Sequence, residues 1–529
     1  MGKYPLHLLF LLIAMAIGSC QQKKAIPVQK ELPVHLQGAV NQNSPMVFDS
    51  TEVKAFFQLY PNLAKYTGDV ALIYRKYNFH TIWMDENGVA EFGNSLYSKI
   101  AALDKEGVSS VFPYQDRITG IFEPEIPNLL TNAETDLMIT SLFLFYAEKV
   151  YKGVDEKTTA ALEWLLPRKE LSYENLLDSI VLNPRLLDRD ERTLFRQYYK
   201  LREVLQKYRE IEKNGGWKPI ALDPKLKAYK PGDTCLAILQ IREHLFLTGD
   251  LKVNSGSNKY DTELMTAVKK YQYRNGKIQQ NNITPALIRE LNIPVGERIK
   301  KIIINMERCR WISPDVVNAK ELIFVNIPSF RLNVFRDGKN DFESAVVVGK
   351  TMTKTVIFSG NLSHIVFSPY WVLPESIIKN EVKPGMAKNP NYLATHNMEW
   401  NNGQVRQKPG KKNSLGLVKF IFPNSNNIYL HDTPSKSLFA RESRAFSHGC
   451  IRVAKPGELA VNLLKDDPAW TPEKINAAMN AGKENWYTLK NKIPVYIGYF
   501  TAFVDLKGEI NFYEDVYKKD EQLYEILVK

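Results

Sequence analysis

The fold and the chemistry of this chain are decided by Tyr429–Pro434 (YLHDTP) and Ser447–Val453 (SHGCIRV). Cys450 follows a glycine, and His431 lies 19 residues before it. A thiol nucleophile needs a base that takes its proton and backbone amides that hold a developing oxyanion. Gly449 suits the second need, because a residue without a Cβ adopts strained turns that expose amides. A structural cysteine beside unrelated histidines is the alternative, but the polar loop between apolar runs favours catalysis.

These motifs resemble those of the L,D-transpeptidases with a YkuD-type catalytic domain. Further matching segments are Arg406–Gly410, Asn413–Gly416, Lys419–Asn424 and Asn305–Trp311. The resemblance covers most of the chain and points to the large YcbB-like subgroup. It implies a multidomain α+β fold with a helical scaffold, a small peptidoglycan-binding module and a mostly β catalytic domain.

The residues themselves suggest that Cys450 attacks a carbonyl and that His431 is the general acid/base. Amides near His448 to Cys450 are expected to hold the oxyanion, with Ser447, His448 and Gly449 shaping that loop. Arg452 is a candidate for binding a substrate carboxylate, although an ordinary surface arginine is also consistent with the sequence.

Asp432 is a candidate to orient the His431 ring because it directly follows that histidine. The resemblance instead implies that a backbone carbonyl orients the ring. The sequence leaves both possibilities open.

The resemblance also implies the substrates, which are peptidoglycan tetrapeptide stems as donor and acceptor. The thiol would attack the third-residue carbonyl, release the terminal D-Ala and form a 3→3 cross-link, with no metal or other cofactor. A wall-lytic cysteine peptidase, either an L,D-carboxypeptidase or an NlpC/P60-like enzyme, is one alternative. In NlpC/P60 enzymes the cysteine precedes the histidine, whereas here His431 comes first. A non-catalytic wall-binding lipoprotein is another alternative, which the intact motifs disfavour.

Composition sets broader limits. The chain has 529 residues, a hydrophobic content of 44% and a net charge of +12. This length is too great for one hydrophobic core and predicts about three domains. The basic residues are spread along the chain and no nucleic-acid motif is present, so we expect no nucleic-acid partner.

The N-terminus has the pattern of an export signal. Lys3 precedes the apolar run Leu8–Ile17, which ends in Ile17-Gly18-Ser19-Cys20. Such a run is short for a membrane span and typical of a secretory signal. Small residues before a cysteine resemble a lipobox, which predicts a signal peptide over 1–19 and lipid attachment at Cys20. A plain signal peptide with an incidental cysteine is the alternative.

Residues 20–48 are expected to form a flexible tether, and no later segment is long and apolar enough to span a membrane. The mature protein is therefore expected to be periplasmic and lipid-anchored. Gln21 stands where aspartate signals inner-membrane retention in some bacteria, which favours the outer membrane.

Two further cysteines, Cys235 and Cys309, are open to either of two interpretations, a disulfide or two thiols. The chain has no CxxC or HExxH spacing, so the sequence gives no support for a metal site.

Two helical regions are predicted before the catalytic domain. Residues 50–225 form the scaffold, with a helix over Glu134–Tyr151 that Asn132 caps. Residues 228–293 form three helices, in which Asp261 caps the second and Pro285 lies in the first turn of the third. This order resembles a peptidoglycan-binding module, and a generic helical spacer is the alternative.

The catalytic domain is predicted over 320–505. Strands are expected over 322–327, 331–335, 342–348, 365–373, 418–422 and 428–431, with Asp337-Gly338 as a hairpin turn. Residues 374–415 are interpreted as a capping insertion, or lid, and a disordered surface loop is the alternative. Residues 506–529 are expected to add a C-terminal strand and helix.

Overall fold

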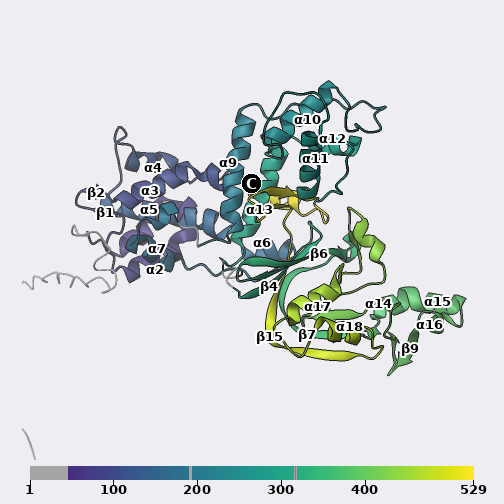
Figure 1. The fold of residues 1–529 in the computed structure, drawn as a ribbon. Helices are drawn as coiled ribbons and strands as arrows, with labels where there is room; N and C mark the ends of the chain where they lie inside the picture. The colour runs from purple at the N-terminus through teal and green to yellow at the C-terminus, as the bar shows by residue number, and fades with distance from the viewer. Residues whose placement is uncertain (1–45, 190–192, 315, 317–318, 529) are drawn as a thin grey trace, which may run out of the picture.

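The computed structural model describes residues 46–189, 193–314, 316 and 319–528. The predicted signal peptide, Cys20 and nearly all of the tether lie outside these residues. The described chain is a mixed helix and sheet protein with a helical N-terminal region and a β-rich C-terminal half (Figure 1). Within the described residues, no helix has both the length and the apolar character needed to span a membrane.

The N-terminal helices surround one long buried helix, α5 (Asn132–Tyr146), in which all residues except Asn132 and Glu134 are buried. Its N-cap is Thr131, which forms a capping box with Glu134, so the prediction that Asn132 caps this helix is wrong. The neighbouring helices are α1 (Thr51–Leu59), α2 (Thr67–Lys76), α3 (Glu91–Ala101), α4 (Gln115–Phe122), α6 (Glu156–Ala161), α7 (Tyr173–Leu182), α8 (Leu186–Arg189) and α9 (Gln197–Lys213).

The three-helix region comprises α10 (Leu236–Leu247), α11 (Thr262–Arg274) and α12 (Pro285–Leu291). Its buried side chains, among them Ile241, Leu264 and Ile288, form a cluster separate from the main core. The Asp261 carboxylate accepts a hydrogen bond from the Leu264 amide, which confirms the predicted cap, and Pro285 starts the third helix as expected.

The β-rich half contains a sheet with the strand order β11-β12-β14-β6-β5-β4-β15-β7-β3, and β11 also pairs with β7. The strands from β11 to β7 therefore close on themselves around a hydrophobic core. Their bounds are β4 (Glu321–Asn326), β5 (Arg331–Arg336), β6 (Lys339–Gly349), β7 (Ile357–Phe367), β11 (Val418–Ile421), β12 (Leu430–His431), β13 (Ala445–Ser447), β14 (Ile451–Val453) and β15 (Asn485–Gly498). Helices α17 (Pro456–Leu464) and α18 (Pro472–Met479) also pack against this core.

Two details of the strand prediction can be compared with the structure. Asp337 and Gly338 both have positive φ, +46° and +74°, which confirms the predicted hairpin turn. The strand predicted over 365–373 is wrong at both ends. β7 begins earlier, at Ile357, and Ser368, with a φ of +46°, separates it from the short β8 (Trp371–Val372).

Residues 374–415, which are predicted to form a capping insertion and are called the lid below, are folded rather than a disordered loop. They contain α14 (Glu375–Ile377), a π-helix (Ile378–Val382), α15 (Lys383–Lys388), α16 (Tyr392–Thr395), β9 (Met398–Asn401) and β10 (Gln404–Gln407). β10 lies between β8 and β9 in a small sheet. Leu373, Val382 and Val405 form a separate buried cluster. The lid projects from one end of the catalytic sheet (Figure 1).

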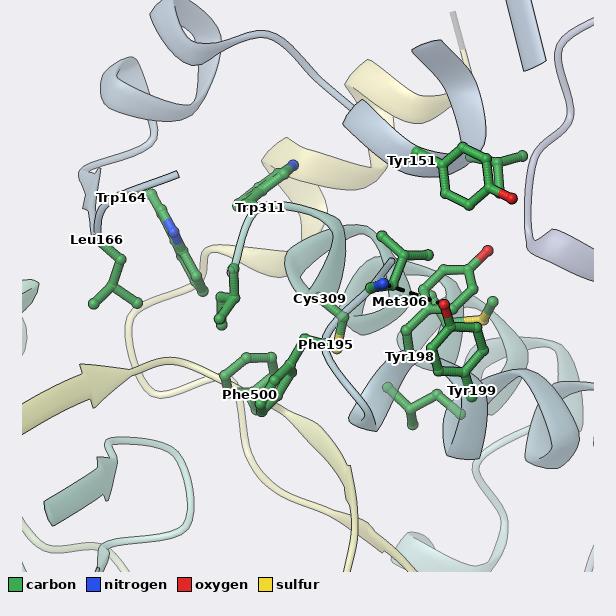
Figure 2. Close-up of a cluster of buried hydrophobic side chains, with 14 of the residues drawn as sticks. Tyr151, Trp164, Leu166, Phe195, Tyr198, Tyr199, Met306, Cys309, Trp311 and Phe500 are labelled. Atoms are coloured by element: carbon green, nitrogen blue, oxygen red, sulfur yellow. Dashed lines mark hydrogen bonds between the residues drawn. The ribbon is translucent and has the colours of Figure 1, made fainter. Parts of the chain in front are cut away.

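The N-terminal helices and the catalytic sheet share one hydrophobic core. Trp164, on β3 (Trp164–Leu165), packs edge-on against Trp311 with ring centroids 5.0 Å apart, and its ring lies 6.1 Å from that of Phe500 (Figure 2). β3 itself pairs in parallel with β7. The helical region therefore adds both a strand and aromatic side chains to the catalytic half.

The helix α13 (Val295–Arg310) connects these parts through buried polar groups. Arg310 donates to Glu307 (2.8 Å), to the Glu106 carbonyl (2.7 Å) and to the Val150 carbonyl (3.0 Å). Glu307 also accepts from the Val154 amide (2.6 Å) and from the Trp311 indole (2.8 Å). After β15 the chain returns to this helix through β16 (Ala502–Val504), β17 (Ile510–Phe512) and α19 (Asp520–Leu527).

Candidate active site

The turn before Cys450 is held by its own side chains. Ser447 Oγ donates to the Cys450 carbonyl (2.6 Å) and accepts from the Gly449 amide (3.1 Å). Gly449 has a φ of +118°, a conformation that favours glycine. The Gly449 amide is therefore occupied within the turn, and the other amides near His448 to Cys450 remain the candidates for holding the oxyanion. In the described part of the chain, the amides of His448 and Cys450 have no hydrogen-bond partner.

Neighbouring segments hold the same turn from outside. Thr353 Oγ1 donates to the Ser447 carbonyl (3.0 Å), and Thr355 Oγ1 donates to the Gly449 carbonyl (2.7 Å). The buried Tyr517 hydroxyl accepts from the Thr355 amide (3.1 Å), so the C-terminal segment also supports the turn.

His431 lies on β12, between β11 and β14. Its Nδ1 lies 2.5 Å from the Asp432 backbone carbonyl. A carbonyl can only accept, so Nδ1 carries the proton and Nε2 has a lone pair available. The Asp432 carboxylate instead accepts from the amides of Leu417 (2.9 Å) and Thr433 (2.6 Å) and pairs with Lys436. The ring is therefore oriented by a backbone carbonyl, as the resemblance implies, and not by the carboxylate.

Burial favours the neutral form of both reacting groups. It lowers the pKa of His431 to about 4, with further lowering by the charges of Arg452 and Lys419. It also raises the pKa of the Cys450 thiol, against hydrogen bonds from Tyr429 and the charge of Arg452. The pair is thus poised for proton transfer during attack rather than held as a preformed thiolate and imidazolium.

Among the described residues, no direct hydrogen bond joins the Cys450 thiol to His431. Cys450 Sγ lies 3.6 Å from the Asn427 carbonyl, and the Tyr429 hydroxyl is hydrogen-bonded to it. Burial and the nearby thiol raise the pKa of Tyr429, whose hydroxyl also bonds to Trp371 of β8. Catalytic hydrogen bonds are often long before substrate binds, so the lack of a direct thiol–imidazole bond is compatible with proton transfer between Cys450 and His431.

Tyr429 is a site residue that the sequence-based candidates omit. It lies two positions before His431, and such positions on an extended chain face the same side. The signal in the sequence that could have identified Tyr429 is an aromatic hydroxyl two positions before His431.

Arg452 and His448 have different surroundings. Arg452 is paired in register with His431, and its Nε is buried without a hydrogen-bond partner among the described residues. It is therefore not an ordinary surface arginine. His448 is half-exposed, and its Nε2 lies 3.7 Å from the Glu381 carboxylate.

The other cysteines do not form a disulfide. Cys235 and Cys309 are both free thiols, and Cys309 is buried in the shared core, where burial raises its pKa. In the described residues, no group of three or more His, Cys, Asp and Glu side chains is arranged to hold a metal ion.

With this geometry in place, comparison with known families gives a match around the site. Residues 320–471 match the L,D-transpeptidase catalytic domain. This segment contains Cys450, His431, Tyr429 and Arg452, so the site lies within the part of the chain that matches the L,D-transpeptidase catalytic domain. Residues 68–205 match the scaffold domain, and residues 228–293 lie outside both matches.

The chain is similar to a Haemophilus influenzae protein described as "Putative L,D-transpeptidase". The two are 36% identical over 245 residues, which is 42% of this chain and 49% of that protein. The chain thus spans about half the length of this curated relative.

Solved L,D-transpeptidases from Mycobacterium smegmatis and Stackebrandtia nassauensis also match. Identity is 13% and 17%, with TM-scores of 0.21 and 0.22. The matches cover 34% and 51% of this chain, and 58% and 94% of those structures. At these scores they add nothing to the family match.

Proposed function

We propose that this protein is an L,D-transpeptidase of the YcbB-like subgroup that forms 3→3 cross-links in peptidoglycan through a cysteine acyl-enzyme. The observation that carries the proposal is a neutral His431, with Nε2 available, on the strand beside the Cys450 turn. Both residues lie within the segment that matches the L,D-transpeptidase catalytic domain.

In the first half-reaction, His431 Nε2 takes the Cys450 proton as Sγ attacks the third-residue carbonyl of a tetrapeptide stem. We assign the oxyanion to the Cys450 amide, which has no other partner among the described residues, and to the Tyr429 hydroxyl, which is hydrogen-bonded to the Cys450 thiol. The tetrahedral intermediate then collapses, His431 gives its proton to the departing D-Ala amine, and a thioester remains on Cys450.

In the second half-reaction, an amine from an acceptor stem attacks the thioester. His431 takes a proton from this amine, and the thiolate leaves and is reprotonated, so that a new amide joins the two stems. No metal or redox group takes part in either step.

The remaining parts of the chain would bring the enzyme to its substrate. We propose that the three-helix region binds peptidoglycan and that lipid on Cys20 anchors the exported protein to a membrane, with the outer membrane preferred. The lipobox-like Ile17–Cys20 supports the second point. Cys20→Ala should move the protein out of the membrane fraction, and a variant that stays there would contradict lipid anchoring.

The mechanism is tested by incubating the enzyme with purified tetrapeptide muropeptides and identifying the products by mass. Cys450→Ala should give neither an acyl-enzyme nor a 3→3 dimer. His431→Ala should slow acylation by roughly 10²–10⁴-fold, the range for a lost general base.

Cys235→Ala and Cys309→Ala are the controls and should leave acylation unchanged. An adduct on Cys450→Ala, or a normal rate in His431→Ala, would contradict the mechanism. Tripeptide without dimer from the wild type would identify an L,D-carboxypeptidase instead.

A further inference from the structure

Lys419 lies beside the catalytic histidine and takes no part in the mechanism above. It is on β11 and is paired in register with His431 of β12, which is itself paired with Arg452 of β14. Paired residues on adjacent strands point to the same face of a sheet. Their chain neighbours Val418, Phe420, Leu430, Ile451 and Val453 all lie in the hydrophobic core. Lys419, His431 and Arg452 therefore form a row on the opposite face, which is the face of the active site.

Among the described residues, no carboxylate lies within ion-pair distance of the Lys419 ammonium group, and Glu484 acts on it only as a nearby charge that partly opposes the lowering of its pKa. Its Nζ lies 3.5 Å from the Tyr370 carbonyl and 5.5 Å from the centre of the Trp486 ring. Glu484 accepts hydrogen bonds from the Tyr370 amide (2.9 Å) and the Trp486 indole (3.0 Å). Burial lowers the pKa of Lys419. A partly desolvated cation without a counter-ion is costly, and an anionic ligand offsets that cost.

The order of the strands indicates which part of the substrate this cation meets. Cys450 directly precedes β14, on one side of β12, whereas Lys419 lies on β11, on the other side. The acyl part of the donor stays on Cys450, and the leaving amine takes its proton from His431 between them. Any group attached to the carbon next to that amine is thereby directed toward β11.

We propose that Lys419 binds the carboxylate on the carbon next to the reacting amine, and so makes the enzyme select leaving groups that are α-amino acids with a free C-terminus. This inference rests on the proposed transpeptidase function and names its specificity residue. In a tetrapeptide donor, the terminal D-Ala carries such a carboxylate two bonds from the amine that His431 protonates.

The same subsite applies to the acceptor. By microscopic reversibility, an incoming amine attacks the thioester from the place that the leaving amine vacated. Lys419 therefore favours acceptor amines that carry a carboxylate on the adjacent carbon. One side chain then sets the chemical class of both the product released and the acceptor used.

The test compares a tetrapeptide stem with the same peptide carrying a C-terminal carboxamide. The enzymes are the full-length wild type, Lys419→Met and Lys419→Arg, with Lys490→Met as the control at an exposed lysine of β15. Wild type, Lys419→Arg and Lys490→Met should prefer the free acid in kcat/KM by about 10- to 100-fold, the range for a hydrogen bond to a charged group.

Lys419→Met should lose this preference through a slower reaction of the acid, with the amide unchanged. The amide also controls for any effect of Lys419 on the pKa of His431, because such an effect would alter both substrates equally. If Lys419→Met keeps the preference for the acid, the inference fails while the proposed function stands. If the wild type converts neither peptide, the proposed function fails first.

The acceptor is tested on the preformed acyl-enzyme with D-alanine and D-alaninamide as probes. Wild type should transfer the acyl group faster to D-alanine, and Lys419→Met should use both amines at the same rate. A preference for D-alanine that survives in Lys419→Met would overturn the acceptor half of the inference.

Discussion

The N-terminal helices and the three-helix region are attached to the catalytic sheet in different ways. The N-terminal helices share the sheet's hydrophobic core and contribute β3 to it. The three-helix region has a core of its own and meets the rest of the molecule mostly through polar contacts, such as Arg274 to the Ile510 carbonyl (2.7 Å) and Lys270 to Glu509. Trp217 adds an aromatic contact to Tyr208 of α9, with ring centroids 6.3 Å apart. Shared apolar burial couples the stability of two parts, whereas a polar interface couples them weakly. The scaffold is therefore part of the folding unit of the enzyme, and the three-helix region is an attachment to it.

The largest expected effect concerns the buried polar centre of α13. Glu307→Ala removes the carboxylate that pairs with Arg310 and leaves a buried, uncompensated guanidinium. Breaking such a pair typically costs about 3–5 kcal/mol. We expect global destabilisation in urea unfolding, together with loss of carbapenem acylation at temperatures where the wild type is folded.

Arg242→Met is the matched control in the three-helix region. Arg242 is fully buried and pairs with Asp261 at 2.6 Å. Its loss should destabilise that region and leave acylation at Cys450 unchanged. If Glu307→Ala and Arg242→Met lost acylation equally, the N-terminal helices and the three-helix region would be coupled to the catalytic sheet to the same extent. That result would contradict the difference described above.

An intermediate effect is expected in acid. Burial lowers the pKa of His244, in α10, to about 3, and its Nδ1 has no hydrogen-bond partner in the part of the chain that the structure describes. Between pH 6.5 and 3 the unfolded chain binds a proton that the folded chain does not, so stability falls as the pH falls. By pH 5 this amounts to about 2 kcal/mol.

His244→Leu should remove this acid sensitivity from the three-helix region alone. The measurement is hydrogen exchange over α10–α12 at pH 7 and pH 5. His431 has the same sign of shift, so the catalytic domain should keep its own acid sensitivity in this variant. If His244→Leu also slowed hydrogen exchange in the catalytic sheet at pH 5, relative to the wild type, the two cores would not be independent.

The smallest effect on chemistry is expected from removing residues 217–294. A Cβ built on Gly216 would lie 3.2 Å from a Val295 side-chain methyl, so the two ends of the deletion are adjacent and a short glycine linker rejoins them. Acylation by a small β-lactam should be unchanged, and co-sedimentation with isolated sacculi should fall. A folded deletion protein that no longer acylates would assign this region to the catalytic architecture.

Much of the local structure follows from local chemistry. Asp261 caps its helix and Asp337-Gly338 forms its hairpin, because both depend on hydrogen bonds and φ angles within a few residues. The Thr131 cap was missed by one position, since Thr131 and Asn132 are both capping residue types and the sequence does not rank them. The strand break at Ser368 also had a local signal, because Pro369 follows it and a proline cannot donate to the hydrogen bonds between strands.

The sequence by itself determined the chemistry of this protein. A cysteine after a glycine, an upstream histidine and an arginine two positions later are local features that identify a thiol site. Only the tertiary structure decided how these residues are used. In the folded chain, the Gly449 amide is hydrogen-bonded to Ser447, the Asp432 carbonyl orients the His431 ring, and Tyr429 and Lys419 lie beside the reacting groups. The physical reason is that strand register and shared burial depend on partners far apart in the chain, which no pattern within one segment encodes.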